Sequence, residues 1–321
     1  MENVGKSPQL ELTCCREKGG VTILRLRSSG GAVTVPDTLW GLPVTAIGDR
    51  AFAPGAADVE GETVRLLGDG GETDNRRITA VRLPDTIRHV GNYAFYNCTG
   101  LRTLSLSGET ENWGGCALMN CRSLNTFHIR LSDPASTVMA YFADELPGEL
   151  DMTLQYPGGS VARLLFPDYQ ESYEENSPAH HFDYFIHGAG YPYHHVFRNK
   201  RLSLTDFDGL WSAFLQTEHD DDCALRLAFY RLRYPREVSA EAEGAYLRYL
   251  RAHSGEALVW LVAEGDMEGL AWLLGRTEPS REALTQGCET ARIRGRAEAV
   301  ALLLEEQHRR FAPARTRRFD L

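Results

Sequence analysis

Apolar residues recur at a fixed spacing between residues 78 and 129. The segment Ile78–Leu83 is apolar at its first, fourth and sixth positions, and Leu101–Leu106 and Leu124–Ile129 repeat this pattern at steps of 23 residues. The last two apolar residues of each segment are two positions apart, so both point to one side of a strand. A fixed period in the twenties is typical of a solenoid, in which each turn buries its apolar face against the next.

The positions between these strands keep the same offset. Pairs in one unit recur 23 residues later in the next: Val90-Gly91 and Trp113-Gly114, Ala94-Phe95 and Ala117-Leu118, Asn97-Cys98 and Asn120-Cys121. A glycine permits a tight turn, and a small residue beside a large one fills the interior. We therefore expect a return leg in each turn, with Cys98 and Cys121 as buried structural thiols.

The run ITAVRLPDTIRHVGNYAFYNCTGL, from Ile78 to Leu101, resembles the BspA-type leucine-rich repeat, whose pattern is strand, Leu-Pro, Ile-Gly, Ala-Phe, Cys, Leu. An earlier run, VTVPDTLWGLPVTAIGDRAF, is similar and carries five extra residues between Asp37 and Gly48. The copy from Leu101 departs from the pattern with Ser107 for proline and a tryptophan for isoleucine. The resemblance covers roughly residues 30–131 and implies a leucine-rich-repeat fold, used in that family for many binding and surface roles.

The residues before the repeats predict a β cap. Residues 9–36 contain alternating segments separated by glycine pairs at Gly19-Gly20 and Gly30-Gly31, which are typical of turns between strands. A solenoid needs an atypical end because its first turn has no neighbour. Residues 53–77 are rich in Gly, Asp and Glu and fit either a divergent repeat around Val64–Leu67 or a mobile loop.

After Ile129 the repeat pattern fades. Residues 132–148 predict a helix with Ser132 or Asp133 at its N-cap and Pro134 at its first position. The following residues, ELDMTLQYP, predict a strand that ends before Gly158. We place a domain boundary near residue 157.

From Thr205 the apolar spacing becomes that of helices. Thr205 and Asp208 resemble a capping box ahead of an apolar stripe, and the aspartates 220–222 open a second helix that Pro235 closes. Ser239 is expected to cap a third helix.

A second internal repeat follows at an offset of 30 residues. Ala263–Leu274 and Ile293–Leu304 each contain the end of one helix, a glycine turn and a helix that ends in Leu-Leu. Residues 255–307 resemble the helical half of ankyrin repeats, although the Thr-Pro-Leu-His signature is missing. The repeat predicts antiparallel helical hairpins stacked side by side.

The predicted fold is thus α+β, a short leucine-rich-repeat solenoid followed by an α-helical module of stacked helical hairpins. The expected organisation is a repeat domain with its cap over residues 1–157, a linking segment of unassigned structure over 158–204, a helical domain over 205–307, and a basic disordered tail over 308–321.

Composition narrows the functional classes. The net charge of −10 opposes nonspecific nucleic-acid binding, and no stretch approaches the roughly 18 apolar residues that cross a bilayer. The seven cysteines have no paired spacing, and the first residues lack a signal-peptide layout. We expect a cytoplasmic chain with free thiols, a protein partner, and no nucleic acid, membrane, metal or cofactor.

A cluster of histidines is the best candidate for a metal site in the sequence. Five of the ten lie within the 16 residues from 180 to 195: His180, His181, His187, His194 and His195. Imidazoles could bind zinc or iron, but the spacing matches no metal motif and the interleaved aromatic residues also suit a core or surface. Loops for phosphates or dinucleotides and a nucleophile elbow are missing from the sequence. The chain is therefore not expected to be an enzyme.

The repeats predict one exposed face. The residue between the two inward positions of each strand should point outward, which aligns Arg82, Ser105 and His128 in one column, while Thr103 and Thr126 begin another. We expect a non-catalytic protein-interaction module or scaffold of a bacterial type, with Arg82 as the anchor for a partner. The alternatives are a metal-dependent enzyme that uses the cluster from His180 to His195, or an effector delivered to another cell.

Overall fold

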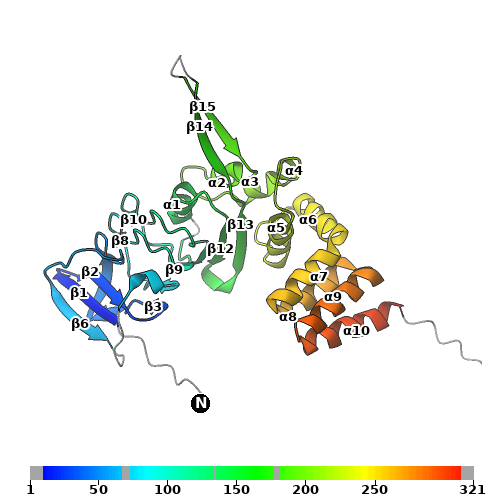
Figure 1. The fold of residues 1–321 in the computed structure, drawn as a ribbon, viewed down its shortest axis with the longest axis horizontal. Helices are drawn as coiled ribbons and strands as arrows, with labels where there is room; N and C mark the ends of the chain where they lie inside the picture. The colour runs from blue at the N-terminus through cyan, green and yellow to red at the C-terminus, as the bar shows by residue number, and fades with distance from the viewer. Residues whose placement is uncertain (1–9, 67–72, 134, 177–180, 312–321) are drawn as a thin grey trace, which may run out of the picture. The chain divides into compact units, whose positions relative to one another are not determined.

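The computed structural model describes residues 10–66, 73–133, 135–176 and 181–311. Contacts divide the chain into two compact units, Met1–His219 and Asp220–Leu321. The first contains a short leucine-rich-repeat solenoid and the second is helical (Figure 1). This arrangement confirms the predicted α+β fold class.

One sheet of the solenoid collects the return legs and the cap. It has the strand order β10-β8-β5-β2-β1-β6, with β4 paired to β5. These strands are β1 (Leu10–Glu17), β2 (Gly20–Ser28), β4 (Thr38–Leu39), β5 (Leu42–Ile47), β6 (Glu62–Leu66), β8 (His89–Val90) and β10 (Asn112–Trp113). Ile47, Val90 and Trp113 lie side by side in parallel register. The return leg that contains Trp113 therefore has the same strand pairing as the two return legs before it.

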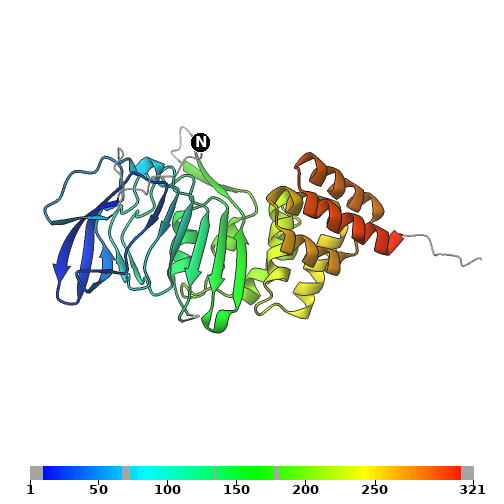
Figure 2. The same ribbon diagram turned by 90° about the horizontal axis from the view of Figure 1, so that it is seen from below.

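The second sheet collects the strands of the repeat pattern. Its order is β13-β12-β11-β9-β7-β3, parallel from β3 to β12 and antiparallel at β13 (Figure 2). These strands are β3 (Ala32–Thr34), β7 (Ala80–Arg82), β9 (Thr103–Ser107), β11 (Thr126–Arg130), β12 (Leu150–Gln155) and β13 (Val161–Phe166).

Side chains of equivalent positions stack between turns and fill the core. The rings of Phe52 and Phe95 stack with centroids 4.4 Å apart, and both side chains are fully buried. Backbone contact is equally close on the return legs. A Cβ added at Gly114 would lie 2.4 Å from Asn92 N and 2.5 Å from Gly91 C, so this position excludes any side chain.

The cysteine column satisfies backbone carbonyls, as predicted. The thiol of Cys98 donates to Phe52 O (3.4 Å) and that of Cys121 donates to Phe95 O (3.1 Å), and both cysteines are free and buried. In the turn before them, Asn75 of the 3-10 helix η1 (Asn75–Arg77) occupies the same column, 23 residues before Cys98. Its amide donates to Phe52 O and to a second carbonyl, each at 2.8 Å.

The cap forms as predicted, with β1 and β2 antiparallel around a turn at Gly19 (φ 119°). The five extra residues of the first copy lie within the hairpin β4–β5, whose tip holds Trp40 and Gly41 at positive φ. Residues 62–66, within the segment left open between a repeat and a loop, form β6, which pairs with β1. They extend the cap sheet instead of adding a solenoid turn.

The helix expected over residues 132–148 is shorter than predicted. It is α1 (Val138–Glu145), and its N-cap is Thr137, not Ser132 or Asp133. The carboxylate of Asp133 instead accepts a hydrogen bond from Ala135 N (2.8 Å), which closes a local turn ahead of the helix. The predicted first helical residue, Pro134, lies outside the described residues.

The expected boundary near residue 157 lies inside the first unit. The 3-10 helix η2 (Pro157–Gly159) joins β12 to β13, which extends the same sheet, and the compact unit continues to His219. The linking segment thus contains regular structure: β13, β14 (Gln170–Asn176), β15 (His181–His187) and α2 (Tyr191–His194).

Two short helices complete the first unit, α3 (Leu204–Gly209) and α4 (Trp211–Phe214). The predicted capping box at Thr205 and Asp208 is wrong. The N-cap is Ser203, whose hydroxyl accepts from Asp206 N (3.2 Å), because the helix begins one residue before Thr205.

The second unit contains α5 (Asp221–Arg233), α6 (Ala240–Ala252), α7 (Ser254–Glu264), α8 (Met267–Thr277), α9 (Arg281–Ile293) and α10 (Ala297–Phe311). Ser239 is the N-cap of α6, as predicted, and Asp220, one of the three aspartates expected to open the preceding helix, is the N-cap of α5. The helix α9 packs against both α7 and α10.

The 30-residue repeat appears as two equivalent turns between helices. Gly265 (φ 75°) ends α7 and Gly295 (φ 66°) follows α9, each in the left-handed region that favours glycine. Only residues 278–280 connect α8 to α9. The similarity to ankyrin helices stays a prediction. Residues 308–311, expected in a basic tail, belong to α10, and 312–321 lie outside the described residues.

Candidate binding surfaces

The predicted columns lie on the outer face of the second sheet. Ala80, Thr103 and Thr126 are paired in parallel register, and two residues further on so are Arg82, Ser105 and His128. This confirms the predicted alignment. The column of Arg82 continues to Thr34 on one side, and to Thr153 and Arg163 on the other. We call this outer surface, from β3 to β13, the strand face.

Side chains alternate between inward and outward positions along each strand, and this explains why the strand face is exposed to solvent. Leu104, Leu106, Phe127 and Ile129 point inward and are at most 1% exposed, whereas Arg82 and His128 between such positions are exposed. The strand face is therefore rigid, because each outward side chain stands on a strand whose neighbours are fixed in the core.

The arginines of the strand face differ in their partners. Arg130 pairs with Asp85 (2.7 Å) and donates to a backbone carbonyl, and Arg163 makes two hydrogen bonds to Asp151, at 2.5 and 2.9 Å. The guanidinium of Arg82 makes no hydrogen bond or ion pair with any residue in the described ranges. Its guanidinium is available to a carboxylate from outside the chain.

The three histidines of the cluster whose side chains are described make different contacts. His187 is exposed, with Nε2 3.0 Å from the hydroxyl of Ser172, and His195 stacks on Tyr191 with centroids 3.9 Å apart. His194 is buried, and its Nδ1 and Nε2 each lie 2.9 Å from a backbone carbonyl oxygen, of Ala143 and Pro167. Burial lowers the pKa of His194. Its role is to join α1 to the end of β13.

The described part of the chain contains no group of three or more His, Cys, Asp or Glu side chains placed to hold a metal ion. His180 and the side chain of His181 lie outside what is described. Nor does any described helix combine the length and apolar character needed to cross a bilayer.

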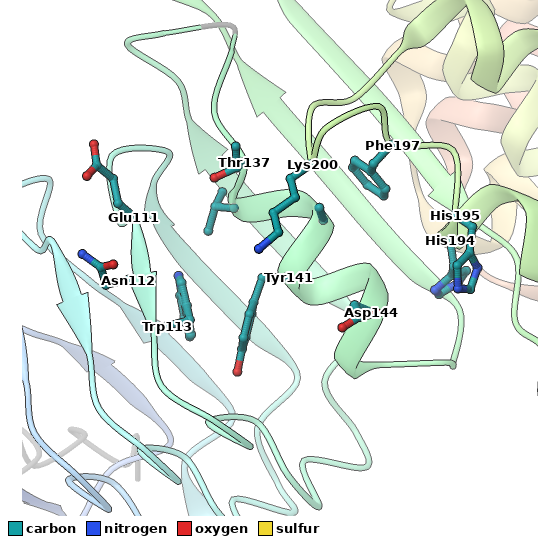
Figure 3. Close-up of a pocket in the computed structure, with 12 residues that line it drawn as sticks. Glu111, Asn112, Trp113, Thr137, Tyr141, Asp144, His194, His195, Phe197 and Lys200 are labelled. Atoms are coloured by element: carbon teal, nitrogen blue, oxygen red, sulfur yellow. The ribbon is translucent and has the colours of Figure 1, made fainter.

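A pocket beside the last return leg was not predicted. Its volume is about 500 Å³, and α1, β10 and residues 194–200 contribute its lining (Figure 3). The rings of Trp113 and Tyr141 stack with centroids 5.2 Å apart, and Phe142 meets Trp113 edge-on at 5.0 Å. The sequence did hold a signal for this pocket, since Trp113 replaces the aliphatic residue of the repeat column.

Below the pocket, α1 closes the end of the solenoid. The hydroxyl of Tyr141 donates to Gly114 O (2.9 Å), and the carboxylate of Glu145 accepts from Leu118 N (2.9 Å). Burial raises the pKa of both Tyr141 and Glu145. These contacts satisfy backbone groups that a further solenoid turn would otherwise bind. Tyr141 and Glu145 therefore act as a structural cap.

One known protein family matches part of the repeat region. Residues 73–141 match the family described as BspA type Leucine rich repeat region (6 copies), so this stretch is a BspA-type repeat region. The run at residues 33–52 lies outside the match.

Among solved structures, a T. pallidum leucine-rich repeat protein is 23% identical over 38% of this chain and 51% of that chain, with a TM-score of 0.29. A leucine-rich repeat protein from Bacteroides capillosus is 21% identical over 37% of this chain and 80% of that one, with a TM-score of 0.27. A third, from Bacteroides ovatus, is 22% identical over 38% and 30%, with a TM-score of 0.28. No curated protein gives a significant match to the chain.

Proposed function

We propose that this chain is a non-catalytic protein-interaction module whose strand face binds a protein partner. The repeat family supports an interaction or scaffold role in general. The observation that carries the proposal is the exposed guanidinium of Arg82, which has no partner among the described residues and lies beside Ser105 and His128 on an ordered sheet. A bacterial type of scaffold in the cytoplasm, with free thiols, is part of the same proposal.

The chemistry of the strand face favours an acidic segment of the partner. Thr103, Thr126 and Ser105 are half-buried hydroxyl residues that can donate or accept hydrogen bonds. Arg82 can bind a carboxylate bidentately, and arginine is enriched among residues that dominate binding energy. Little conformational entropy is lost on docking because the strands are already ordered.

The test compares two double variants in affinity capture from a lysate of the source cells. R82A/H128A removes the two exposed side chains of the predicted column, and R77A/H89A removes an exposed arginine and an exposed histidine from outside the strand face. A defined protein should be retained by the parent chain and by the control, and lost from R82A/H128A.

Both variants should melt within about 0.5 kcal/mol of the parent chain, because exposed substitutions rarely alter stability further. Full retention of the partner by R82A/H128A would exclude the strand face and direct the search to the helical unit, whose ankyrin-like hairpins could offer another surface. A purified chain that retains no partner and turns over a small molecule would overturn the proposal.

A further inference from the structure

The hairpin β14–β15 is a second exposed surface, separate from the strand face. It forms a sheet of its own with only two strands, so within the described residues the outer edge of each strand is unpaired. In Figure 1 the two strands extend away from the helices α1 to α3. A two-stranded sheet is marginally stable in water, and an open edge can pair with another chain.

The hairpin has an unusual charge distribution. Residues 164–197 contain neither lysine nor arginine, whereas 34 of these residues occur in the whole chain. On the strands themselves the described acidic side chains are Glu171, Glu174 and Glu175 of β14 and Asp183 of β15, all exposed. The acidic residues are thus concentrated on β14.

Aromatic side chains lie among these acids. Tyr173 is 67% exposed and pairs across the strands with Tyr184, with ring centroids 5.0 Å apart. Alternation puts Glu171, Tyr173 and Glu175 on one face of β14. The hydroxyl of Tyr184 donates to Glu171, which fixes the tyrosine pair against the strand.

We propose that the outer edge of β14 binds a basic extended segment of a partner protein, which adds as a third strand. Main-chain hydrogen bonds would supply affinity, as in other cases of strand addition. Arginine or lysine at alternate positions of that segment would lie beside Glu171 and Glu175, because cross-strand neighbours are about 5 Å apart. A guanidinium between them would stack on Tyr173.

The same charges disfavour a second copy of this chain as the occupant. Pairing β14 with its own copy would place Glu171, Glu174 and Glu175 beside acids of equal charge, which destabilises a sheet. The proposal does not depend on the strand face, since no residue is common to the two surfaces.

The test uses a fluorescein-labelled peptide of four Arg-Val repeats and the full chain, with binding followed by fluorescence anisotropy. The peptide should bind and should slow hydrogen exchange in β14. The variant E171Q/E174Q/E175Q should weaken binding about tenfold, the loss expected for three surface ion pairs. A peptide of four Glu-Val repeats should not bind.

The control E289Q/E298Q/E305Q removes the same charge from exposed positions of the helical unit and should bind like the parent chain. It separates the local acids of β14 from the net charge of −10. Circular dichroism confirms that both triple variants are folded. Equal binding by the two triple variants, equal binding of the acidic peptide, or a dimer of the parent chain that protects β14 from exchange would each overturn the proposal.

Discussion

The solenoid and the helical unit both consist of repeats, yet neighbouring repeats meet through different atoms. In the solenoid the backbone of one turn lies against the backbone of the next, and Gly114 N donates to Val90 O at 2.7 Å. In the helical unit side chains make the contact. A Cβ added at Gly287 of α9 would meet Leu303 of α10 at 3.2 Å and Leu258 of α7 at 3.5 Å.

The units also differ in what recurs along the sequence. The 23-residue offset of the solenoid covers strands, return legs and turns, because every part of a turn contacts the next one. In the helical unit, what recurs at the 30-residue offset is the hydrogen bonding at the C-terminal end of a helix. Asp266 N donates to Leu261 O and, 30 residues later, Arg296 N donates to Ala291 O, at 3.1 and 2.8 Å. The solenoid should therefore tolerate less change at its glycines than the helical unit.

The largest effect is expected for Gly114→Ala. The new Cβ would lie 2.4 Å from Asn92 N, and neither backbone can move without disturbing the sheet. Overpacking of this kind should lower the free energy of unfolding of the solenoid by about 2–3 kcal/mol. Hydrogen exchange of β9 and β11 would measure the loss.

The neighbouring Gly115→Ala is the matched control. Its Cβ would meet only the side chain of Asn92, at 3.7 Å. The free energy of unfolding measured by hydrogen exchange should therefore change by less than about 0.5 kcal/mol. Equal effects of the two substitutions would show that backbone contact between turns does not limit this position.

A smaller effect, dependent on pH, is expected from His194. Burial lowers its pKa in the folded state, so below the unfolded pKa of about 6.5 the unfolded chain binds more protons. The histidine's contribution to stability is complete above pH 6.5 and falls as the pH decreases. Between pH 7.5 and 5.5 the loss should reach at most about 1.4 kcal/mol.

Urea unfolding of the parent chain and of His194→Gln at both pH values would measure this contribution. The variant should lose stability at pH 7.5 and show a weaker dependence on pH. The exposed neighbour His195 provides the matched substitution, since His195→Gln removes an imidazole that does not join α1 to β13 and should change stability at pH 7.5 by no more than about 0.5 kcal/mol. A variant H194Q with an unchanged pH dependence would contradict the argument.

The sequence predicted the features that depend on contacts between equivalent residues. The strand register, the thiols of Cys98 and Cys121 and the outward column of Arg82 all follow from one offset, because a solenoid brings residues 23 apart into contact. The cap at Ser239 and the start of α5 at the aspartates 220–222 were predictable because the partners of the capping side chains lie within three residues.

Features that depend on distant or irregular contacts were not predictable. Residues 62–66 pair with β1 across more than 45 residues, and the pocket requires α1 to lie beside Trp113. Histidines close in sequence lie on different elements, His187 on β15 and His194 on α2, and bind different partners. The acidic composition around β14 was visible in the sequence, but the edge of β14, which is unpaired within the described residues, follows only from the two-stranded sheet.

The smallest expected effects come from two glycines of the helical unit, and they have opposite signs. Gly265 follows α7 at φ 75°, and the nearest atoms to an added Cβ belong to the flexible guanidinium of Arg296, at 3.0 Å. Gly265→Ala should therefore cost about 1 kcal/mol through backbone strain alone. Gly275 lies within α8 with no atom within 4 Å of an added Cβ, so Gly275→Ala should stabilise the unit by about 0.5–1 kcal/mol.

Hydrogen exchange of α7 and α8 would measure both substitutions, with β9 and β11 as the internal reference. Each change should alter exchange in the helices and leave the reference strands unchanged, because the two compact units hold their repeats by separate contacts. If Gly265→Ala cost as much as Gly114→Ala, helix ends would be as intolerant as the solenoid backbone. The contrast between backbone contact in one unit and side-chain contact in the other would then fail.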